Sequence, residues 1–68
     1  MGTHHLLSWN QQTATLWSAT HPNILFSIEG WDYPDGPRYR VEGNGHPMGA
    51  APTLDAAKDI AQAYVNSL

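Results

Sequence analysis

Residues 54–68 have the pattern of one amphipathic helix, and this helix limits what the rest of the chain can form. Apolar side chains recur at helical spacing along one stripe, while polar side chains cover the other side. Thr53 is positioned to cap the helix, and Asp55 lies in the first turn, where the helix dipole favours a negative charge. We expect a helix from about Thr53 to Ser67, buried along a stripe of Leu54, Ala57, Ile60, Ala61, Tyr64, Val65 and Leu68. The residues before it must supply an apolar surface for that stripe.

Two segments before the helix have the alternation of half-buried strands. In residues 24–29, Ile24, Phe26 and Ile28 point to one side and the residues between them to the other. In residues 38–42, Tyr39 and Val41 point inward and three charged side chains outward. These five apolar residues form the predicted surface beneath the helix.

The remaining segments are read from turn and strand signals. Residues 13–19 are rich in β-branched and aromatic side chains, which favour a strand. Residues 46–51 form either a short edge strand or an irregular link, because Pro47 limits a strand to an edge. Turns are expected at residues 10–12, 20–23 and 43–45, and an irregular loop at residues 30–37, which hold two glycines and two prolines.

Together these segments predict an α+β fold. It is an antiparallel three- to four-stranded β-meander with one C-terminal helix packed on one face, since short turns favour neighbouring antiparallel strands. Residues 1–68 are expected to form a single domain in which residues 1–5 are disordered. With a single helix available, the other face of the sheet stays uncovered.

Composition excludes several classes of function. The formal net charge is −3 with only 3 Lys and Arg residues, which argues against a protein that grips nucleic-acid phosphates. The chain has no cysteine, and its four histidines lack the spacing of metal ligands. No serine or carboxylate pair has a catalytic context. We therefore expect no catalytic residue, no metal and no cofactor, and predict that the protein is not an enzyme. No apolar run is long enough to span a membrane.

Aromatic residues are the more informative candidates, because there are more of them than a small core needs. Trp31 and Tyr33 lie in the predicted loop, where they either fold back over the core or stand out as anchors for a partner. Asp32 and Asp35 lie beside them and would steer the loop toward a basic partner. The prolines limit the freedom of the loop, so the rings would be presented at low entropic cost.

The position of Trp17 depends on strand register. If Leu16 faces the helix, then Trp17 lies on the uncovered face near Leu25 and Arg40, and that face resembles a binding surface. If the register is reversed, Trp17 belongs to the core. A symmetric dimer through Trp17 and Leu25 would hide the uncovered face.

The acidic residues offer a further candidate surface. Asp55 and Asp59 lie one turn apart on the polar side of the helix, and the chain holds six carboxylates in all. Such charges are normally a solvated surface. Alternatively, an acidic face would imitate a nucleic-acid backbone and meet a basic groove on a partner.

Two resemblances add expectations about origin. Residues 48–58 (MGAAPTLDAAK) look like a G-x-x-x-T-L-x-x-A-K-x-x-A ending, which follows a meander opened by a tryptophan (here Trp9) in many small phage and mobile-element proteins. The resemblance covers most of the chain and implies a viral or accessory-gene origin. Small phage inhibitors of host defence, including anti-CRISPR proteins, are often of this size and acidity.

The same ending is also similar to the second half of a double-stranded-RNA-binding domain, in which three strands precede an A-K-x-x-A helix. Ala57, Lys58 and Ala61 fit that frame. The first helix of that family has no counterpart here, and Thr53, Leu54 and Asp55 stand where it has lysines.

These observations favour a small non-enzymatic protein-binding module. The phage-like pattern implies an inhibitor of a host defence protein in the bacterial cytoplasm, acting by surface occlusion or as a DNA mimic. The alternative is a nucleic-acid-associated module related to half of a double-stranded-RNA-binding domain. The expected partner-binding residues are Trp17, Trp31, Asp32, Tyr33, Asp35, Arg40, Asp55 and Asp59. The partner is a host protein, with no membrane and no small-molecule substrate, and a homodimer is a further option.

Overall fold

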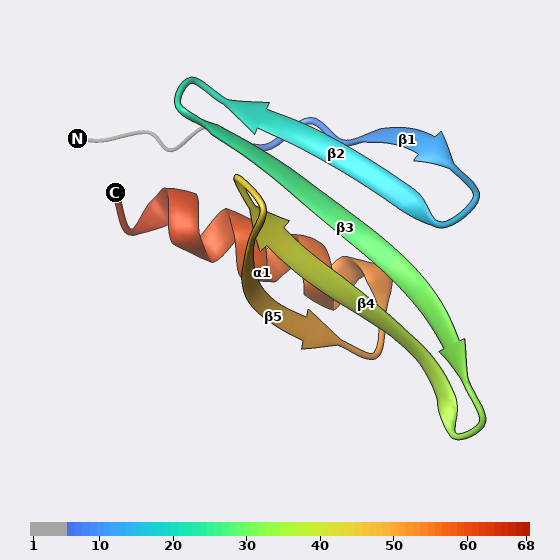
Figure 1. Ribbon diagram of the computed structural model, residues 1–68. Coiled ribbons are helices and arrows are strands. Elements are labelled where there is room, and N and C mark those ends of the chain that lie inside the picture. Colours follow the sequence, from blue (N-terminus) through green and yellow to red (C-terminus); the bar gives the residue numbers. More distant parts are fainter. Residues whose placement is uncertain (1–5) are drawn as a thin grey trace.

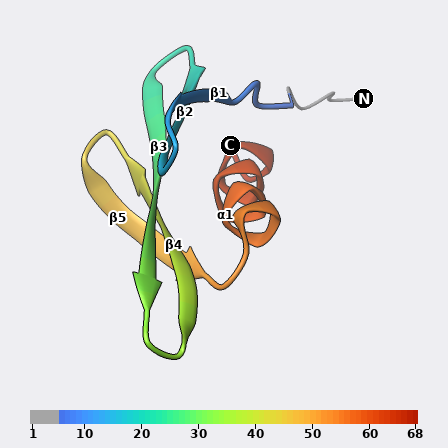
Figure 2. The same ribbon diagram turned by 90° about the vertical axis from the view of Figure 1, so that its right-hand side faces the viewer.

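The computed structural model describes residues 6–68, so the predicted disorder of residues 1–5 lies outside the described residues. Five strands precede one helix: β1 (Asn10–Thr13), β2 (Leu16–His21), β3 (Ile24–Tyr33), β4 (Gly36–Gly43), β5 (His46–Ala51) and α1 (Leu54–Asn66). The strands form one antiparallel sheet in chain order, and α1 packs on one side of it (Figures 1 and 2). The predicted α+β meander with a C-terminal helix is confirmed, but the sheet has five strands rather than three or four.

The additional strand is β1, where the sequence predicts a turn at residues 10–12. Gln11 pairs with Trp17 of β2, and the turn lies instead at residues 14–15. All four residues of β1 are exposed. An edge strand of this kind needs no apolar alternation, so its sequence resembles a polar turn. At the opposite edge β5 is the predicted edge strand, with Pro47 in it.

The core lies between α1 and the middle of the sheet. Phe26, Ile28 and Val41 are fully buried on the sheet, as the alternation predicts. Ala57, Ala61 and Val65 of the helix lie against them. Small alanine side chains let a helix approach a sheet closely, and the larger residues of β3 and β4 fill the space between the layers.

The predicted stripe on α1 is wider than the part that is buried. Tyr64 is 44% exposed, and only the edge of its ring meets Phe26, with ring centroids 6.2 Å apart. Leu68 lies beyond the C-cap residue Ser67 and is also exposed. The expectation that both belong to the buried stripe is wrong, because Tyr64 lies at the margin of the contact and Leu68 follows the end of the helix.

Both ends of the helix layer are fixed by polar contacts. The Thr53 hydroxyl accepts a hydrogen bond from the Ala56 N–H at 3.1 Å, which confirms the predicted N-cap. Near the C-terminal end, Gln62 Oε1 accepts a hydrogen bond from the Leu7 N–H at 2.9 Å. Leu7 and Trp9 pack against the core, so the segment before β1 is held on the helix side of the sheet.

The predicted irregular loop at residues 30–37 is a regular hairpin, so that prediction is wrong. β3 continues to Tyr33, β4 begins at Gly36, and only residues 34–35 form the turn. β2 pairs with β3 only as far as Glu29, and β5 pairs with β4 only as far as Tyr39. Residues 31–33 and 36–38 therefore pair only with each other. We call residues 30–38 the arm; it projects beyond the ends of β5 and α1 (Figure 1).

Strand pairing assigns each side chain to one of two faces. Trp17 pairs with Ile28, so Trp17 lies on the face covered by α1, which we call the helix face. The structure therefore has the second of the two registers considered for β2. Trp17 packs beside Tyr39 with ring centroids 5.9 Å apart. Trp17 and Leu25 lie on opposite faces, and the predicted dimer contact through both residues is wrong.

Candidate functional site

One face of the sheet has no covering layer among the elements that the structure describes (Figure 2). Alternation along β2, β3 and β4 places a mixed set of aliphatic, aromatic and charged side chains on it. We call this surface the open face, and its side chains are Leu16, Ser18, Thr20, Leu25, Ser27, Glu29, Trp31, Tyr33, Arg38, Arg40 and Glu42.

The arm carries the most exposed aromatic rings of the open face. Trp31 is 49% exposed and Tyr33 is 50% exposed, although rings of this size are normally covered. Arg38 is paired with Trp31 across the ladder, and its guanidinium carbon lies 5.8 Å from the centre of the Tyr33 ring. This distance fits a cation–π contact, which holds the two side chains against each other. Leu25, 53% exposed, adds an apolar side chain at the other end of β3.

The described residues, 6–68, contain a single ion pair, and it lies on the open face next to the arm. Arg40 and Glu29 are cross-strand partners, and an Arg40 guanidinium nitrogen lies 3.5 Å from Glu29 Oε1. Both side chains are about half exposed. Such a pair contributes little to stability in water, but it orients both charged groups on the surface where a partner would bind.

The structure brings some of the predicted site residues together and separates others. Trp31, Tyr33 and Arg40 share the open face. Asp32 points from β3 to the helix face, beyond the helix, and Asp35 lies in the turn at the tip of the arm. Trp17 is on the helix face, beside the Tyr39 ring for which Gly30 leaves room.

The carboxylates do not gather on one surface. Asp55 and Asp59 are exposed on α1, in the layer on the other side of the sheet from the open face. Glu29 and Glu42 are on the open face, where two basic residues accompany them. This arrangement distributes the six carboxylates over both layers, all of them within the described residues.

Two residues of the open face were missing from the predicted partner-binding residues. Arg38 is expected to point outward beside Arg40 and to join the loop in the partner contact, but its contact with Tyr33 depends on the hairpin register, which an irregular loop does not have. Leu25 is expected near Trp17 and Arg40 on the uncovered face and as a dimer contact, but it is not among the expected partner-binding residues. Its position between two inward residues of β3 was the signal that it points to the uncovered side.

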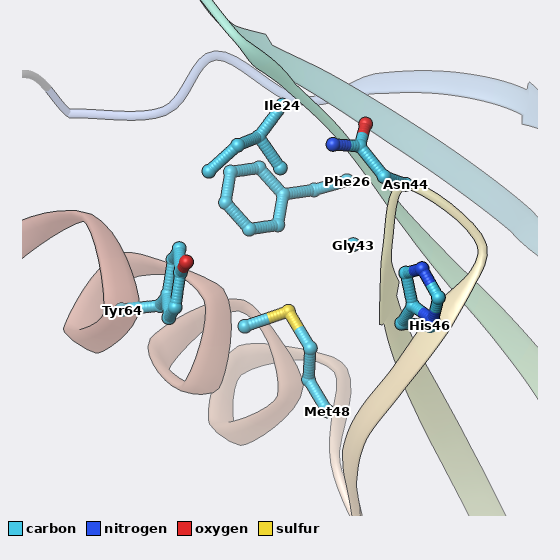
Figure 3. Close-up of a pocket in the computed structure, with 7 residues that line it drawn as sticks. All are labelled: Ile24, Phe26, Gly43, Asn44, His46, Met48 and Tyr64. Atoms are coloured by element: carbon cyan, nitrogen blue, oxygen red, sulfur yellow. The ribbon is translucent and has the colours of Figure 1, made fainter.

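A hollow lies on the helix face, between the end of α1 and the β4–β5 turn (Figure 3). It has a volume of about 390 Å³, and Figure 3 shows Tyr64 and Met48 facing each other across it. Gly43 keeps it open, because a Cβ there would lie 3.0 Å from Met48 Sδ. Its lining is Ile24, Phe26, Gly43, Asn44, His46, Met48 and Tyr64.

The β4–β5 turn that borders this hollow is hydrogen-bonded to the start of β3. Asn44 and Gly45 both have positive φ, at 52° and 81°, as a two-residue hairpin turn requires. Asn44 Oδ1 accepts a hydrogen bond from the Leu25 N–H at 2.9 Å, and the Asn44 N–H donates to the Leu25 carbonyl at 2.8 Å. The Asn44 side-chain amide therefore links the β4–β5 turn to the β2–β3 turn.

No family model matches the sequence, and comparison with curated proteins and with solved structures gave no match either. Among residues 6–68, no three His, Asp or Glu side chains are grouped so that they could bind a metal ion. In the same range, no helix is long and apolar enough to cross a membrane.

Proposed function

We propose that the protein is a small non-enzymatic protein-binding module and that its open face, extended by the arm, is the contact surface. The observation that carries this proposal is the exposure of Trp31 and Tyr33 beside Arg38 on a regular, projecting hairpin. Tryptophan, tyrosine and arginine are the residues that most often dominate binding at protein interfaces. Because the arm is a hydrogen-bonded ladder, its rings are already ordered before binding.

The mode of action that fits this surface is occlusion. A sheet face that ends in a projecting hairpin is able to cover part of a partner and to reach into a neighbouring groove. In line with the phage-like ending of the sequence, we propose a host defence protein in the bacterial cytoplasm as the partner. Surface occlusion is favoured over DNA mimicry, because the six carboxylates are distributed over both layers instead of forming one acidic surface.

The nucleic-acid alternative has one supporting observation. Arg38 and Arg40 share the open face with Trp31, and nucleic-acid-binding proteins combine basic and aromatic residues. Glu29 and Glu42 lie on the same face, however, so its formal charge is zero. A neutral face cannot release many counterions from a nucleic acid, and we favour a protein partner. Tight, salt-sensitive binding in a gel-shift assay would reverse this choice.

Replacement of the arm's rings tests the proposed contact. The chain is used as bait in a bacterial lysate, the captured protein is identified by mass spectrometry, and its affinity is then measured with purified components. We expect Trp31→Ala or Tyr33→Ala to weaken binding by about 30-fold, which corresponds to the ~2 kcal/mol typical of an anchor residue.

Tyr64→Ala is the matched control for Tyr33→Ala. Tyr64 is similarly exposed but lies on the helix, away from the open face. It should bind the partner like the parent protein. Each variant is first checked for an unchanged melting temperature. Equal affinity of the parent, Trp31→Ala and Tyr33→Ala would show that the arm is not the contact.

A further inference from the structure

The pattern of side chains on the open face repeats across the β3–β4 ladder as complementary pairs. Glu29 lies opposite Arg40. One step along the arm, Trp31 lies opposite Arg38. These two neighbouring positions of β3 therefore each have a partner on β4 that attracts them, one as an ion pair and the other as a cation beside an aromatic ring.

Such a pattern is self-complementary under one particular two-fold rotation. Consider an axis that runs parallel to the strands, between β3 and β4, in a plane just above the open face. Rotation about it places β3 of one copy over β4 of the other. Glu29 of the first copy then faces Arg40 of the second, and Trp31 faces Arg38, and both contacts occur twice by symmetry.

From this complementarity we infer that a second copy of the chain occupies the open face, in a face-to-face dimer with the two helices on the outside. Two sheets that stack in this way lie about 10 Å apart with their strands nearly aligned, so side chains as long as Arg and Trp span the gap. The resulting layers are helix, sheet, sheet and helix.

The distribution of charge also favours a second copy as the occupant. The open face holds Glu29 and Glu42 together with Arg38 and Arg40, so it is formally neutral. The formal net charge of −3 lies entirely outside that face, on the arm tip and α1. Two acidic chains thus meet through neutral surfaces and keep their mutual repulsion away from the interface. The apolar side chains of Leu25, Trp31 and Tyr33 gain cover at the same time.

This inference rests on the proposed function, because the same surface serves both. A second copy covers the exposed rings when no partner is present, and a host protein would have to displace it. Binding of the partner and formation of the dimer are then mutually exclusive.

Charge reversal within the interface tests the arrangement. Glu29→Arg and Arg40→Glu each produce a chain whose interface contacts are repulsive with itself, and light scattering should show the dimer dissociation constant raised ~10-fold or more. The Glu29→Arg chain carries arginine at positions 29 and 40, and the Arg40→Glu chain carries glutamate at both. In an equal mixture, the two arginines of one chain therefore face the two glutamates of the other. We therefore expect the mixture to recover the dimer mass that neither variant reaches alone at the same concentration.

Two controls keep this result specific. The double variant Glu29→Arg/Arg40→Glu restores the pairs within and between copies, so it should dimerise like the parent. Lys58→Glu reverses a charge on α1, outside the open face, and should leave the dimer unchanged.

A parent protein that stays monomeric at high concentration overturns the inference, as does a mixture with no more dimer than its components. Neither result affects the proposed function, which depends on capture of a host protein. Conversely, recovery of the dimer in the mixture upholds the inference even if no host partner is found.

Discussion

Ala61→Asp is expected to leave the chain unfolded at 25 °C. Ala61 is fully buried in the middle of α1, where its methyl group lies among the core side chains of β3 and β4. A carboxylate there would lose its hydration among apolar side chains, at an expected loss of several kcal/mol. For 68 residues the total stability is of order 3–10 kcal/mol, so one such loss removes most or all of it. Circular dichroism should show neither a cooperative melting transition nor helical signal.

Ala63→Asp is the matched control. It makes the same substitution on the same helix, two positions away, on an exposed side chain. Helix propensity alone would lower stability by less than 1 kcal/mol. If Ala61→Asp melts at the same temperature as Ala63→Asp, then α1 does not dock through this side.

Phe26→Ala is expected to lower the free energy of unfolding by ~3–5 kcal/mol, a typical loss for a large buried ring. Phe26 has no exposed surface, and it lies beneath the hollow that Tyr64 and Met48 border. Removing the ring would enlarge an existing space of about 390 Å³, and the hydrogen bonds that hold the β4–β5 turn to Leu25 oppose its collapse into that space. Urea denaturation followed by tryptophan fluorescence measures the change.

Leu25→Ala provides the comparison for this substitution. Leu25 directly precedes Phe26 on β3 but lies on the open face with half of its surface exposed. We expect it to lose less than 1 kcal/mol, since little apolar area leaves the interior. Equal effects of the two substitutions would mean that the faces of β3 have been assigned incorrectly.

Much of the fold follows from local signals that tertiary contacts do not override. Thr53 caps the helix as predicted because its hydroxyl satisfies a free N–H at the helix start. Phe26, Ile28 and Val41 are buried because alternation along a strand has a fixed period of two. Asn44 and Gly45 form a turn because both tolerate positive φ.

The arm could not be predicted because Gly30 and Pro37 are accommodated in strands by contacts and hydrogen-bond directions that only the folded sheet sets. Gly30 remains in β3 because the rings of Trp17 and Tyr39 occupy the space that its missing side chain leaves. The Gly30 N–H donates to the Thr15 carbonyl and not to β4. In an antiparallel ladder, hydrogen-bonded and non-hydrogen-bonded residue pairs alternate. Gly30 belongs to a non-hydrogen-bonded pair of the β3–β4 ladder, so Asp32, two residues on, does too. Pro37 is paired with Asp32, and its backbone nitrogen therefore points away from β3. Pro37 therefore lies in a strand without disrupting a hydrogen bond of the ladder.

The candidate site was predictable in some of its residues but not in its arrangement. Trp31 and Tyr33 stood out because turn chemistry does not require aromatic rings. Trp31, Tyr33 and Arg38 all point to the open face because β3 and β4 are paired in this segment. An irregular loop would not impose a common direction on these side chains. The position of Trp17 depended on the register between β2 and β3, which long-range packing decides.

The most direct test of the central claim is ¹⁹F NMR of the protein labelled with 5-fluorotryptophan at its three tryptophans. Replacing each tryptophan with phenylalanine in turn assigns the three signals. For the free monomer, at a concentration below the dimer dissociation constant, we predict that the Trp31 signal shifts most between H₂O and D₂O. Addition of the captured partner should abolish this solvent dependence while the Trp9 and Trp17 signals change little. A Trp31 signal that is insensitive to solvent in the free monomer, or that keeps its solvent dependence in the complex, would contradict the assignment of the open face as the contact surface.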